Sequence, residues 1–409
     1  AQSRRAKSLQ WVEKFAAVYT PVMVGVSLMF AVVPPLFMGG AWGEWFYEAL
    51  VILVISCPCA LVISTPVSVV AGLASAARNG VLVKGGAFLE TPATLNAVAF
   101  DKTGTLTHGR PGVTDVTPLG GASEGELLGI AAALEARSSH PVARAVMRHA
   151  ALMGVAPLPV EEDQARPGLG AQGRIEGAMY AIGNLRFLEE SGHAARTPEF
   201  EAARERHQRS AGTVVFVWSD TRVLGCITVE DKVRPQSREA LAALGEAGVD
   251  TIVMLTGDNA ATAEKIAREA GVAQFRADLM PEDKTRVVEE LVASGKRVAM
   301  VGDGVNDAPA LAAAHLGIAM GSIGTDVAIE TADVALMSDD LAKLPWLIRH
   351  SRRTMGIIKA NIWFALGVKA VFLLMAALQM ATLWTAILAD MGTSLFVIFN
   401  GLRLLRIKP

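Results

Sequence analysis

The sequence predicts a membrane α-helical part combined with a soluble α/β part. Of the 409 residues, 52% are hydrophobic and 19% are charged, a balance too apolar for an ordinary soluble protein and too charged for one buried wholly in lipid. Long uncharged stretches lie near both ends, and the middle alternates short apolar strands with helices, which is typical of a parallel sheet. We therefore expect four transmembrane helices and a Rossmann-like α/β domain that carries an inserted α+β domain.

The first two transmembrane helices are expected within residues 1–77. Residues 15–43 and 49–77 contain no charged side chain, and each stretch exceeds the roughly 20 residues that cross a bilayer. The linker between them is short, and its Trp42 and Trp45 suit the membrane interface. Two spans are therefore predicted before the soluble part.

The other two transmembrane helices are expected within residues 356–409. Residues 360–402 are long enough for a helical hairpin with a turn near residues 379–383, and their only charges are Lys369 and Asp390. An even number of spans puts all the basic clusters on one side, which the positive-inside rule makes cytoplasmic. These clusters contain Arg4, Arg5, Lys7, Arg78, Lys84, Arg352, Arg353, Arg403, Arg406 and Lys408.

The middle of the chain is expected to form the soluble part. Helical stretches separate four apolar segments that end in Gly, Asp or Thr, at residues 97–101, 251–258, 297–304 and 316–321. This alternation predicts a parallel α/β sheet whose site lies at the carboxyl ends of its strands.

Residues 112–231 interrupt that alternation. They contain a helical stretch at 124–153, a Gly-rich turn region at 168–177 and two further strands, which predicts a second domain inserted into the first. The first domain then comprises residues 78–111 and 232–355.

Charge and cysteine content narrow the possible partners. The formal net charge of −2 comes from 38 Lys and Arg against 40 Asp and Glu, so no basic surface indicates nucleic acid as a partner. Three cysteines cannot build a disulfide framework, and Cys57 and Cys59 are poorly spaced for an unstrained bridge. The sequence therefore predicts a reducing, cytosol-facing context.

The sequence DKTGTLT, residues 101–107, follows the first of the predicted strands. A carboxylate at a strand end is the group that an aspartyl nucleophile needs to attack phosphorus, and Lys102 and nearby amides would stabilise the equatorial oxygens. A lone Asp after a strand is more often a turn residue. Two further clusters, TGDN at 256–259 and GDGVNDAP at 302–309, favour a phosphate site, because a doubly wound sheet brings strand ends together.

These three motifs, in this order, resemble those of the P-type ATPases, whose phosphorylation domain is haloacid-dehalogenase-like and Rossmann-like. The resemblance implies that ATP transiently phosphorylates Asp101. It also implies that Asp101, the Thr103 carbonyl and Asp303 bind Mg²⁺. The remaining catalytic positions, which contact or support the phosphoryl group, are Lys102, Thr256, Gly257, Asp258, Lys284, Asn306 and Asp307.

The inserted α+β domain is expected to bind the nucleotide, although it has no Walker-type loop. The segment EARSSHPVARAV resembles the Ser/Glu-His-Pro element of the heavy-metal class, which places a glutamate and a histidine near adenine. A lone His-Pro on a helix is otherwise usually structural. The GLG and GN segments resemble further nucleotide elements of that class. The positions carried over are Glu135, His140, Gly168, Gly170, Gly183 and Asn184.

Cys57, Pro58 and Cys59 interrupt the second uncharged stretch. Proline in a helix interior removes a hydrogen bond and costs about 3 kcal/mol, and within a membrane such a break is tolerated mainly where it lines a cavity. Thiolates beside the break are soft ligands for Zn²⁺, Cd²⁺, Pb²⁺ or Cu⁺. Cysteine also packs well in helices and cores, which is the interpretation for Cys226. The triplet resembles the Cys-Pro-Cys of heavy-metal-transporting P-type ATPases.

The last two helices indicate which metal is carried. Two thiolates with the carboxylate of Asp390 make a chemically harder ligand set than Cu⁺ prefers, and this set suits a divalent ion. The pattern of Lys369 and Asp390 is similar to the zinc, cadmium and lead branch, in which the lysine is a counterion that helps to expel the metal. The copper pumps carry other elements there, which MGTSL does not match. A structural ion pair is the alternative for these two charges, and Glu44 and Glu48 are expected to be solvated.

The resemblance covers the C-terminal portion of such a pump, and this portion lacks the actuator domain. We therefore expect the actuator and the N-terminal metal-binding region as partners, together with ATP, metal ions and the lipid bilayer. The implied protein exports Zn²⁺, Cd²⁺ or Pb²⁺ and lies in a bacterial inner membrane, with cytoplasmic catalytic domains. Alternatives are a copper(I)-exporting ATPase, a membrane-tethered haloacid-dehalogenase-type phosphatase and a membrane metal sensor. The phosphatase leaves the Cys-Pro-Cys unexplained, and the sensor gives Asp303 and Asp307 no role.

Overall fold

The structure is a computed structural model that describes residues 6–37, 39, 41–192, 197–208, 212–303, 307–321 and 330–406. The chain forms two compact units. The first comprises Ala1–Val98, Ala242–Thr251 and Thr285–Pro409, and the second comprises Ala99–Leu241 and Ile252–Lys284.

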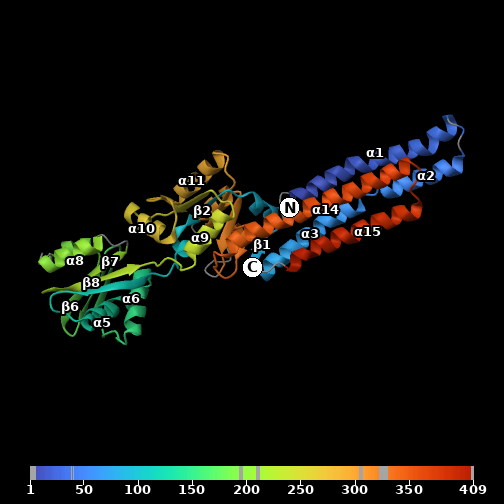
Figure 1. The fold of residues 1–409 in the computed structure, drawn as a ribbon. Helices are drawn as coiled ribbons and strands as arrows, with labels where there is room; N and C mark the ends of the chain where they lie inside the picture. The colour runs from blue at the N-terminus through green and yellow to red at the C-terminus, as the bar shows by residue number, and fades with distance from the viewer. Residues whose placement is uncertain are drawn as a thin grey trace. The chain divides into compact units, whose positions relative to one another are not determined.

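The membrane part belongs to the first unit, and its long helices lie side by side (Figure 1). They are α1 (Lys7–Phe37), α2 (Trp42–Ile55), α3 (Cys59–Arg78), α14 (Lys343–Ala377) and α15 (Leu383–Leu402). Helices α2 and α3 together make one span. With this span, the described residues contain four helices long and apolar enough to cross a membrane. The four predicted transmembrane helices and the predicted turn before α15 are confirmed.

One helix of this bundle is longer than predicted. Helix α14 begins at Lys343, before the expected start at residue 356, and its first turns bury Leu344, Trp346 and Leu347. The 3-10 turn η4 (Arg403–Arg406) follows α15 directly.

Pro58 separates α2 from α3, as predicted. Proline has no N–H to donate, and the amide of Cys57 bonds the Val54 carbonyl at 3.2 Å instead of continuing the helical ladder. The structure joins Cys57 to Cys59 in a disulfide with a Cα–Cα distance of 5.4 Å, so the prediction that their spacing disfavours a bridge is wrong. In an unbroken helix, side chains two positions apart point about 200° apart, but the break at Pro58 lets these two meet.

A buried carboxylate caps the first transmembrane helix. Glu90, the last residue of α4 (Gly86–Glu90), is 8% exposed and accepts a hydrogen bond from the Lys7 amide at 2.9 Å. The same carboxylate accepts from the Ser8 amide and hydroxyl. Unpaired amides at a helix N-terminus favour an anion, so this contact fixes the start of α1. The 3-10 turn η2 (Thr91–Thr94) follows α4.

The sheet of the first unit has the strand order β1-β13-β12-β11. Strands β11 (Val298–Gly302), β12 (Leu316–Met320) and β13 (Val334–Leu336) are parallel, and β1 (Val81–Val83) pairs with β13 in the antiparallel sense. All five residues of β11 and of β12 are buried, as in a sheet covered on both faces. Helix α12 (Ala308–Ala313) packs against both of these strands.

Four elements have residues in both units, namely β2 (Ala97–Asp101), α9 (Ser237–Glu246), β9 (Thr251–Leu255) and α11 (Pro281–Ala293). Within the first unit, the amide of Ala97 donates to the Arg297 carbonyl at 3.1 Å, and the amide of Thr251 donates to the Asn96 carbonyl at 3.2 Å. The N-terminal ends of β2, β9 and β11 are therefore neighbours. All four predicted apolar segments contain a strand, namely β2, β9, β11 and β12.

The second unit contains a six-stranded antiparallel sheet with the order β3-β8-β7-β6-β5-β4. Its strands are β3 (Gly112–Pro118), β4 (Glu161–Arg166), β5 (Gly170–Ile175), β6 (Ala178–Gly183), β7 (Thr213–Ser219) and β8 (Val223–Glu230). The predicted Gly-rich turn region at 168–177 is mostly strand β5, because its glycines permit close pairing with β6. The unit also holds the turn η3 (Lys102–Leu106), helix α10 (Ala260–Ala270), and β10 (Gln274–Arg276), which pairs with β9 in parallel.

Two apolar cores lie on the two faces of this sheet. Alternate residues of β7 face opposite sides, so Val215 and Val217 pack beneath α5 (Glu124–Glu135) and α6 (Pro141–Leu152). Phe216 and Trp218 pack against α7 (Leu185–Glu190) and α8 (Pro198–Gln208), together with the buried Cys226. Cys226 is therefore a core residue, as predicted. The predicted single helical stretch at 124–153 is two helices, because Pro141 starts a new helix after its N-cap.

Candidate functional site

Asp101 is the last residue of β2, all of whose residues are buried. Its side chain is 5% exposed, and Lys284 Nζ lies 2.5 Å from Asp101 Oδ1. A buried carboxylate is costly unless a cation pairs with it, and Lys284 supplies that cation. A carboxylate at a strand end, held by one lysine, has the form required of a nucleophile.

The next residues of the DKTGTLT segment turn away from the strand. Gly104 has φ of +74°, a conformation that favours glycine. Lys102 Nζ pairs with Asp258 Oδ2 at 2.8 Å, and the Asp258 amide donates to Thr256 Oγ1 at 3.1 Å. The structure therefore brings Lys102, Thr256 and Asp258 together, and Gly257 lies between the last two.

Asp231 and Arg234 hold this turn in place, a role that the sequence did not reveal. Arg234 donates from Nη2 to the Gly104 carbonyl and from Nε to the Thr107 carbonyl, both at 3.0 Å. Asp231 Oδ2 accepts from Thr107 Oγ1 at 2.6 Å and from the Gly109 amide at 3.2 Å. From the sequence, these two residues of the segment DKVRP are expected only to mark the hinge back to the phosphorylation domain.

The GDGVNDAP segment begins at Gly302, the last residue of β11 in the first unit. Asp307 is 1% exposed and precedes α12. A Cβ on Gly302 would lie 2.7 Å from Asp307 Oδ2, so only glycine leaves room for this carboxylate. Asp303 follows Gly302 in the chain, and Asn306 lies outside the described residues. Across the part of the chain that the structure describes, no three His, Cys, Asp or Glu side chains form a metal-binding group.

All six residues predicted to bind a nucleotide line one cavity of about 530 Å³ in the second unit. They are Glu135, His140, Gly168, Gly170, Gly183 and Asn184. Arg137, Asp163 and Arg166 line the same cavity and were not predicted. Arg137 is adjacent to the Ser/Glu-His-Pro element, but Asp163 and Arg166 come from β4, a strand that the sequence pattern did not indicate.

Glycine is required where β5 pairs with β6 at the wall of this cavity. Gly170 is opposite Gly183 and has φ of +154°. A Cβ on Gly170 would lie 2.0 Å from the Ile182 carbonyl oxygen, and one on Gly183 would lie 2.4 Å from the Leu169 carbonyl oxygen. Asn184 fixes the neighbouring turn, because its Nδ2 donates to the Gly168 carbonyl and its Oδ1 caps α7. The wall therefore presents bare backbone.

His140 and Glu135 belong to the helical side of the cavity. His140 caps α6, and its Nδ1 accepts a hydrogen bond from the Val142 amide at 3.3 Å, which leaves the proton of a neutral ring on Nε2. Glu135 is 9% exposed. Burial raises the pKa of the Glu135 carboxyl above its ordinary value of 4.5, a Ser138 hydrogen bond opposes that rise, and the charge of Asp163 adds to it.

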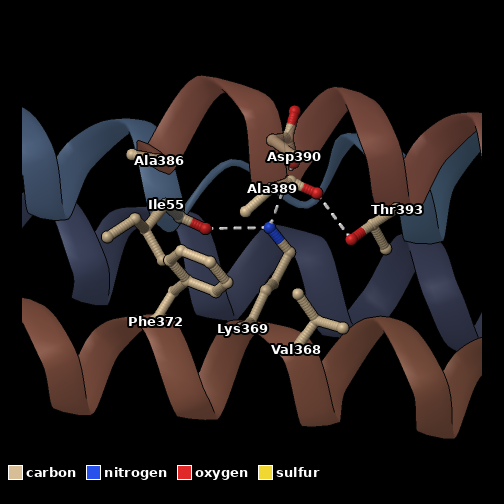
Figure 2. Close-up of a pocket in the computed structure, with 8 residues that line it drawn as sticks. All are labelled: Ile55, Val368, Lys369, Phe372, Ala386, Ala389, Asp390 and Thr393. Carbon is tan, nitrogen blue, oxygen red and sulfur yellow. Dashed lines mark hydrogen bonds and ion pairs between the residues drawn. The ribbon is translucent and has the colours of Figure 1, made fainter. Parts of the chain in front are cut away.

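Lys369 lies at the break between α2 and α3 (Figure 2). Its Nζ donates to the Ile55 carbonyl at 2.8 Å and to the Cys57 carbonyl, and it lies 3.5 Å from Asp390 Oδ1. Proline at position 58 leaves carbonyls of α2 without their helical partners. The ammonium of Lys369 therefore satisfies the polar groups that the break exposes, besides pairing with Asp390.

A small cavity of about 10 Å³ adjoins this lysine, lined by residues of α2, α14 and α15 (Figure 2). That volume holds about one water molecule. Lys369 and Asp390 are the charged side chains of its wall, and Thr393 adds a hydroxyl that donates to the Ala389 carbonyl at 2.6 Å. The bridged Cys57 and Cys59 are not part of the wall, and the cluster of two thiolates with Asp390 stays a prediction.

The chain matches the family described as haloacid dehalogenase-like hydrolase over residues 95–315. It is 48% identical, over its whole length, to the probable cadmium-transporting ATPase of Staphylococcus aureus (strain MRSA252), of which it covers 57%. It is 44% identical over 99% of its length to the zinc/cadmium/lead-transporting P-type ATPase of Escherichia coli (strain K12), of which it covers 54%. The chain thus spans a little over half the length of these relatives.

The fold is similar to the crystal structure of a zinc-transporting PIB-type ATPase in its E2.Pi state. The TM-score is 0.86 with 43% sequence identity, over 98% of this chain and 66% of that one. The similarity therefore extends over the membrane helices and the soluble domains alike.

Proposed function

The chain belongs to the haloacid dehalogenase-like hydrolases and, among them, to the heavy-metal-transporting P-type ATPases, and from this membership we propose that its parent protein exports Zn²⁺, Cd²⁺ or Pb²⁺. ATP drives the transport through an acyl phosphate on Asp101. The protein is an integral membrane protein, and a bacterial inner membrane with the soluble domains in the cytoplasm is the proposed location. The actuator and N-terminal metal-binding regions of such pumps are its proposed partners.

Asp101 is the proposed nucleophile. One of its carboxylate oxygens forms a bond to the γ-phosphorus of ATP while the bond from that phosphorus to the bridging oxygen breaks, and ADP leaves. Lys284, at 2.5 Å from Asp101, supplies positive charge beside the reacting oxygen. Asp258 holds Lys102 next to the same turn. Thr256, Gly257, Asp303, Asn306 and Asp307 keep their predicted supporting roles.

The oxygens around Asp101 suit Mg²⁺, because carboxylate and carbonyl oxygens are the hard ligands that this ion prefers. Asp101 itself and the Thr103 carbonyl would hold it, and the predicted third ligand is Asp303. When bound, Mg²⁺ supplies charge that offsets the charge of the transferring phosphoryl group.

The cavity at Glu135 and His140 is the proposed ATP site. Its bare backbone at Gly170 and Gly183 lets a flat ring approach closely, and the imidazole of His140 offers a second flat surface. Arg137 and Arg166 bring positive charge for the phosphates. The volume of about 530 Å³ falls within the range of ordinary small-molecule sites.

The observation that carries the transport proposal is the contact of Lys369 with the break. Its ammonium is held by two carbonyl oxygens and one carboxylate inside the membrane part. Charged groups inside a bilayer are costly and mark ion pathways. These oxygens and the reduced thiols of Cys57 and Cys59 would bind the exported ion, with Lys369 as the counterion that replaces it. Reduction of the disulfide must precede binding, because thiolates, not bridged sulfurs, are the ligands.

The proposal is tested by measuring phosphoenzyme formation and metal uptake with the full-length parent protein under reducing conditions. Zn²⁺, Cd²⁺ or Pb²⁺ should stimulate both, and Cu⁺ should not. Asp101→Asn should abolish the phosphoenzyme, and Cys57→Ala should abolish its dependence on metal. Stimulation by Cu⁺ alone would instead indicate a copper pump, and metal-independent phosphatase activity would rule out export.

A further inference from the structure

We propose that Glu48 forms a second site for the exported cation, which the cation reaches after it leaves the cavity at Lys369 and Asp390. This inference rests on the proposed transport function, since an exit site requires that a cation crosses the bundle. Glu48 would bind a divalent ion through its carboxylate oxygens.

Glu48 is less exposed than predicted. It is half-buried in α2, and its Oε2 atom is buried with no hydrogen-bond partner in the part of the chain that the structure describes. Glu44, one turn earlier, is exposed, as predicted. A buried carboxylate oxygen without a donor is unfavourable until a cation or a proton satisfies it.

Glu48 lies on the face of α2 that leads to the cavity. Glu48, Ile52 and Ile55 follow one another at helical spacings of four and three residues, so they share a face of the helix. Ile55 lines the cavity at Lys369 (Figure 2). Glu48 is therefore displaced from the cavity wall by about 10 Å along the helix axis, and it lies on the other side of the Pro58 break from α3 and β1.

An apolar layer separates the cavity from Glu48. This layer consists of buried residues of α2, α14 and α15 and of the turn before α15, namely Val51, Ile52, Ile55, Ala376, Ala381 and Ala386. Ile55 and Ala386 belong both to the layer and to the wall of the cavity. A cation that leaves the cavity in this direction must pass the layer, and the next charged group on this face of α2 is Glu48.

The start of α15 contacts α2 at Tyr47, the residue that precedes Glu48 in the chain. The amide of Leu383, the first residue of α15, donates to the hydroxyl of Tyr47 at 2.9 Å. A carboxylate gives up a divalent cation to water more readily than paired thiolates do, so Glu48 would release the ion after it has passed the apolar layer.

The test compares two readouts in the full-length parent protein reconstituted in vesicles, namely Zn²⁺ uptake and Zn²⁺-dependent labelling of Asp101 by ATP. Glu48→Gln removes the charge and keeps the shape. We expect uptake to fall about tenfold, the effect of losing one strong ion contact, while Zn²⁺-dependent labelling is kept. Retained labelling shows that the variant is folded and fills its first site. Glu48→Asp should restore part of the uptake, and the matched control Glu44→Gln should behave as the wild type.

Two results would overturn the exit site. One is wild-type uptake by Glu48→Gln, and the other is loss of labelling together with uptake, which would place Glu48 in the first site or in the fold. In both cases a wild-type protein that transports Zn²⁺ leaves the proposed function intact. A wild-type protein with neither metal-dependent labelling nor uptake would instead refute the proposed function, and the exit site with it.

Discussion

Replacing Lys369 by methionine removes the charge at the Pro58 break and keeps a side chain of similar length. In the structure this lysine donates to two carbonyl oxygens and pairs with Asp390, and the two side chains of the pair are 10% and 20% exposed. A hydrogen bond from a charged group contributes about 1.5–3 kcal/mol, and breaking a buried ion pair costs about 3–5 kcal/mol. Because these contributions overlap, we expect Lys369→Met to lower the free energy of unfolding by about 3–5 kcal/mol.

The assay is thermal unfolding of the purified protein in detergent, with Lys359→Met as the matched control. Lys359 is on the same helix and is exposed, so its replacement should leave the unfolding midpoint nearly unchanged. Under reducing conditions, saturating Zn²⁺ should raise the midpoint of Lys369→Met more than that of the wild type, because the ion replaces the missing ammonium.

A double mutant distinguishes a working counterion from a purely local ion pair. Lys369→Met leaves Asp390 as an unpaired charge, and adding Asp390→Asn removes that charge. The double variant should therefore recover part of the lost free energy of unfolding, but Zn²⁺ should not stabilise it. An unfolding midpoint that does not change in Lys369→Met would refute this reasoning. Equal stabilisation by Zn²⁺ of Lys369→Met and of the double variant would also refute it.

Three further predictions concern the sulfur pair and the cavity of the second unit. Oxidation of Cys57 and Cys59 to the disulfide should abolish Zn²⁺-dependent labelling of Asp101, and a thiol reductant should restore that labelling. Labelling that survives oxidation would show that the thiolates are not ligands. Gly170→Ala should weaken ATP binding at least tenfold or unfold the domain, because its Cβ would lie 2.0 Å from the Ile182 carbonyl oxygen, and fluorescence titration with ATP checks this. The raised pKa of Glu135 means that the folded protein holds this proton more tightly than the unfolded chain, so its contribution to stability is complete below pH 4.5 and is lost as pH rises through the folded-state pKa. Glu135→Gln should therefore flatten the decline of the unfolding midpoint above pH 4.5, and a parallel decline in both proteins would contradict the assignment.

The membrane spans and the phosphate motifs could be predicted from the sequence because each is a local pattern. Uncharged stretches of sufficient length indicate spans directly, and the six residues predicted to bind a nucleotide are carried by short motifs that the fold brings to one cavity. Strand β4 was harder to predict, since all its residues except Ala165 are polar and it has none of the alternation of a half-buried strand.

The contacts at the break could not be predicted, because they join distant segments. Nothing in the sequence around Lys369 indicates that its ammonium bonds the carbonyls of Ile55 and Cys57. The same holds for Arg234, whose hydrogen bonds to the turn after Asp101 join segments far apart in the chain. The disulfide was mispredicted from spacing alone, since the effect of Pro58 on side-chain direction depends on the local backbone.

The most direct measurement follows the labelling of Asp101 by radiolabelled ATP in the reduced full-length parent protein while the free Zn²⁺ concentration is set by a chelator. If the ion at the Pro58 break governs chemistry at Asp101, labelling rises with Zn²⁺ at the concentration that half-fills the membrane site in a separate binding titration. Asp390→Asn should then shift both curves together. Labelling that does not change between chelated and saturating Zn²⁺ would contradict the link between the two sites.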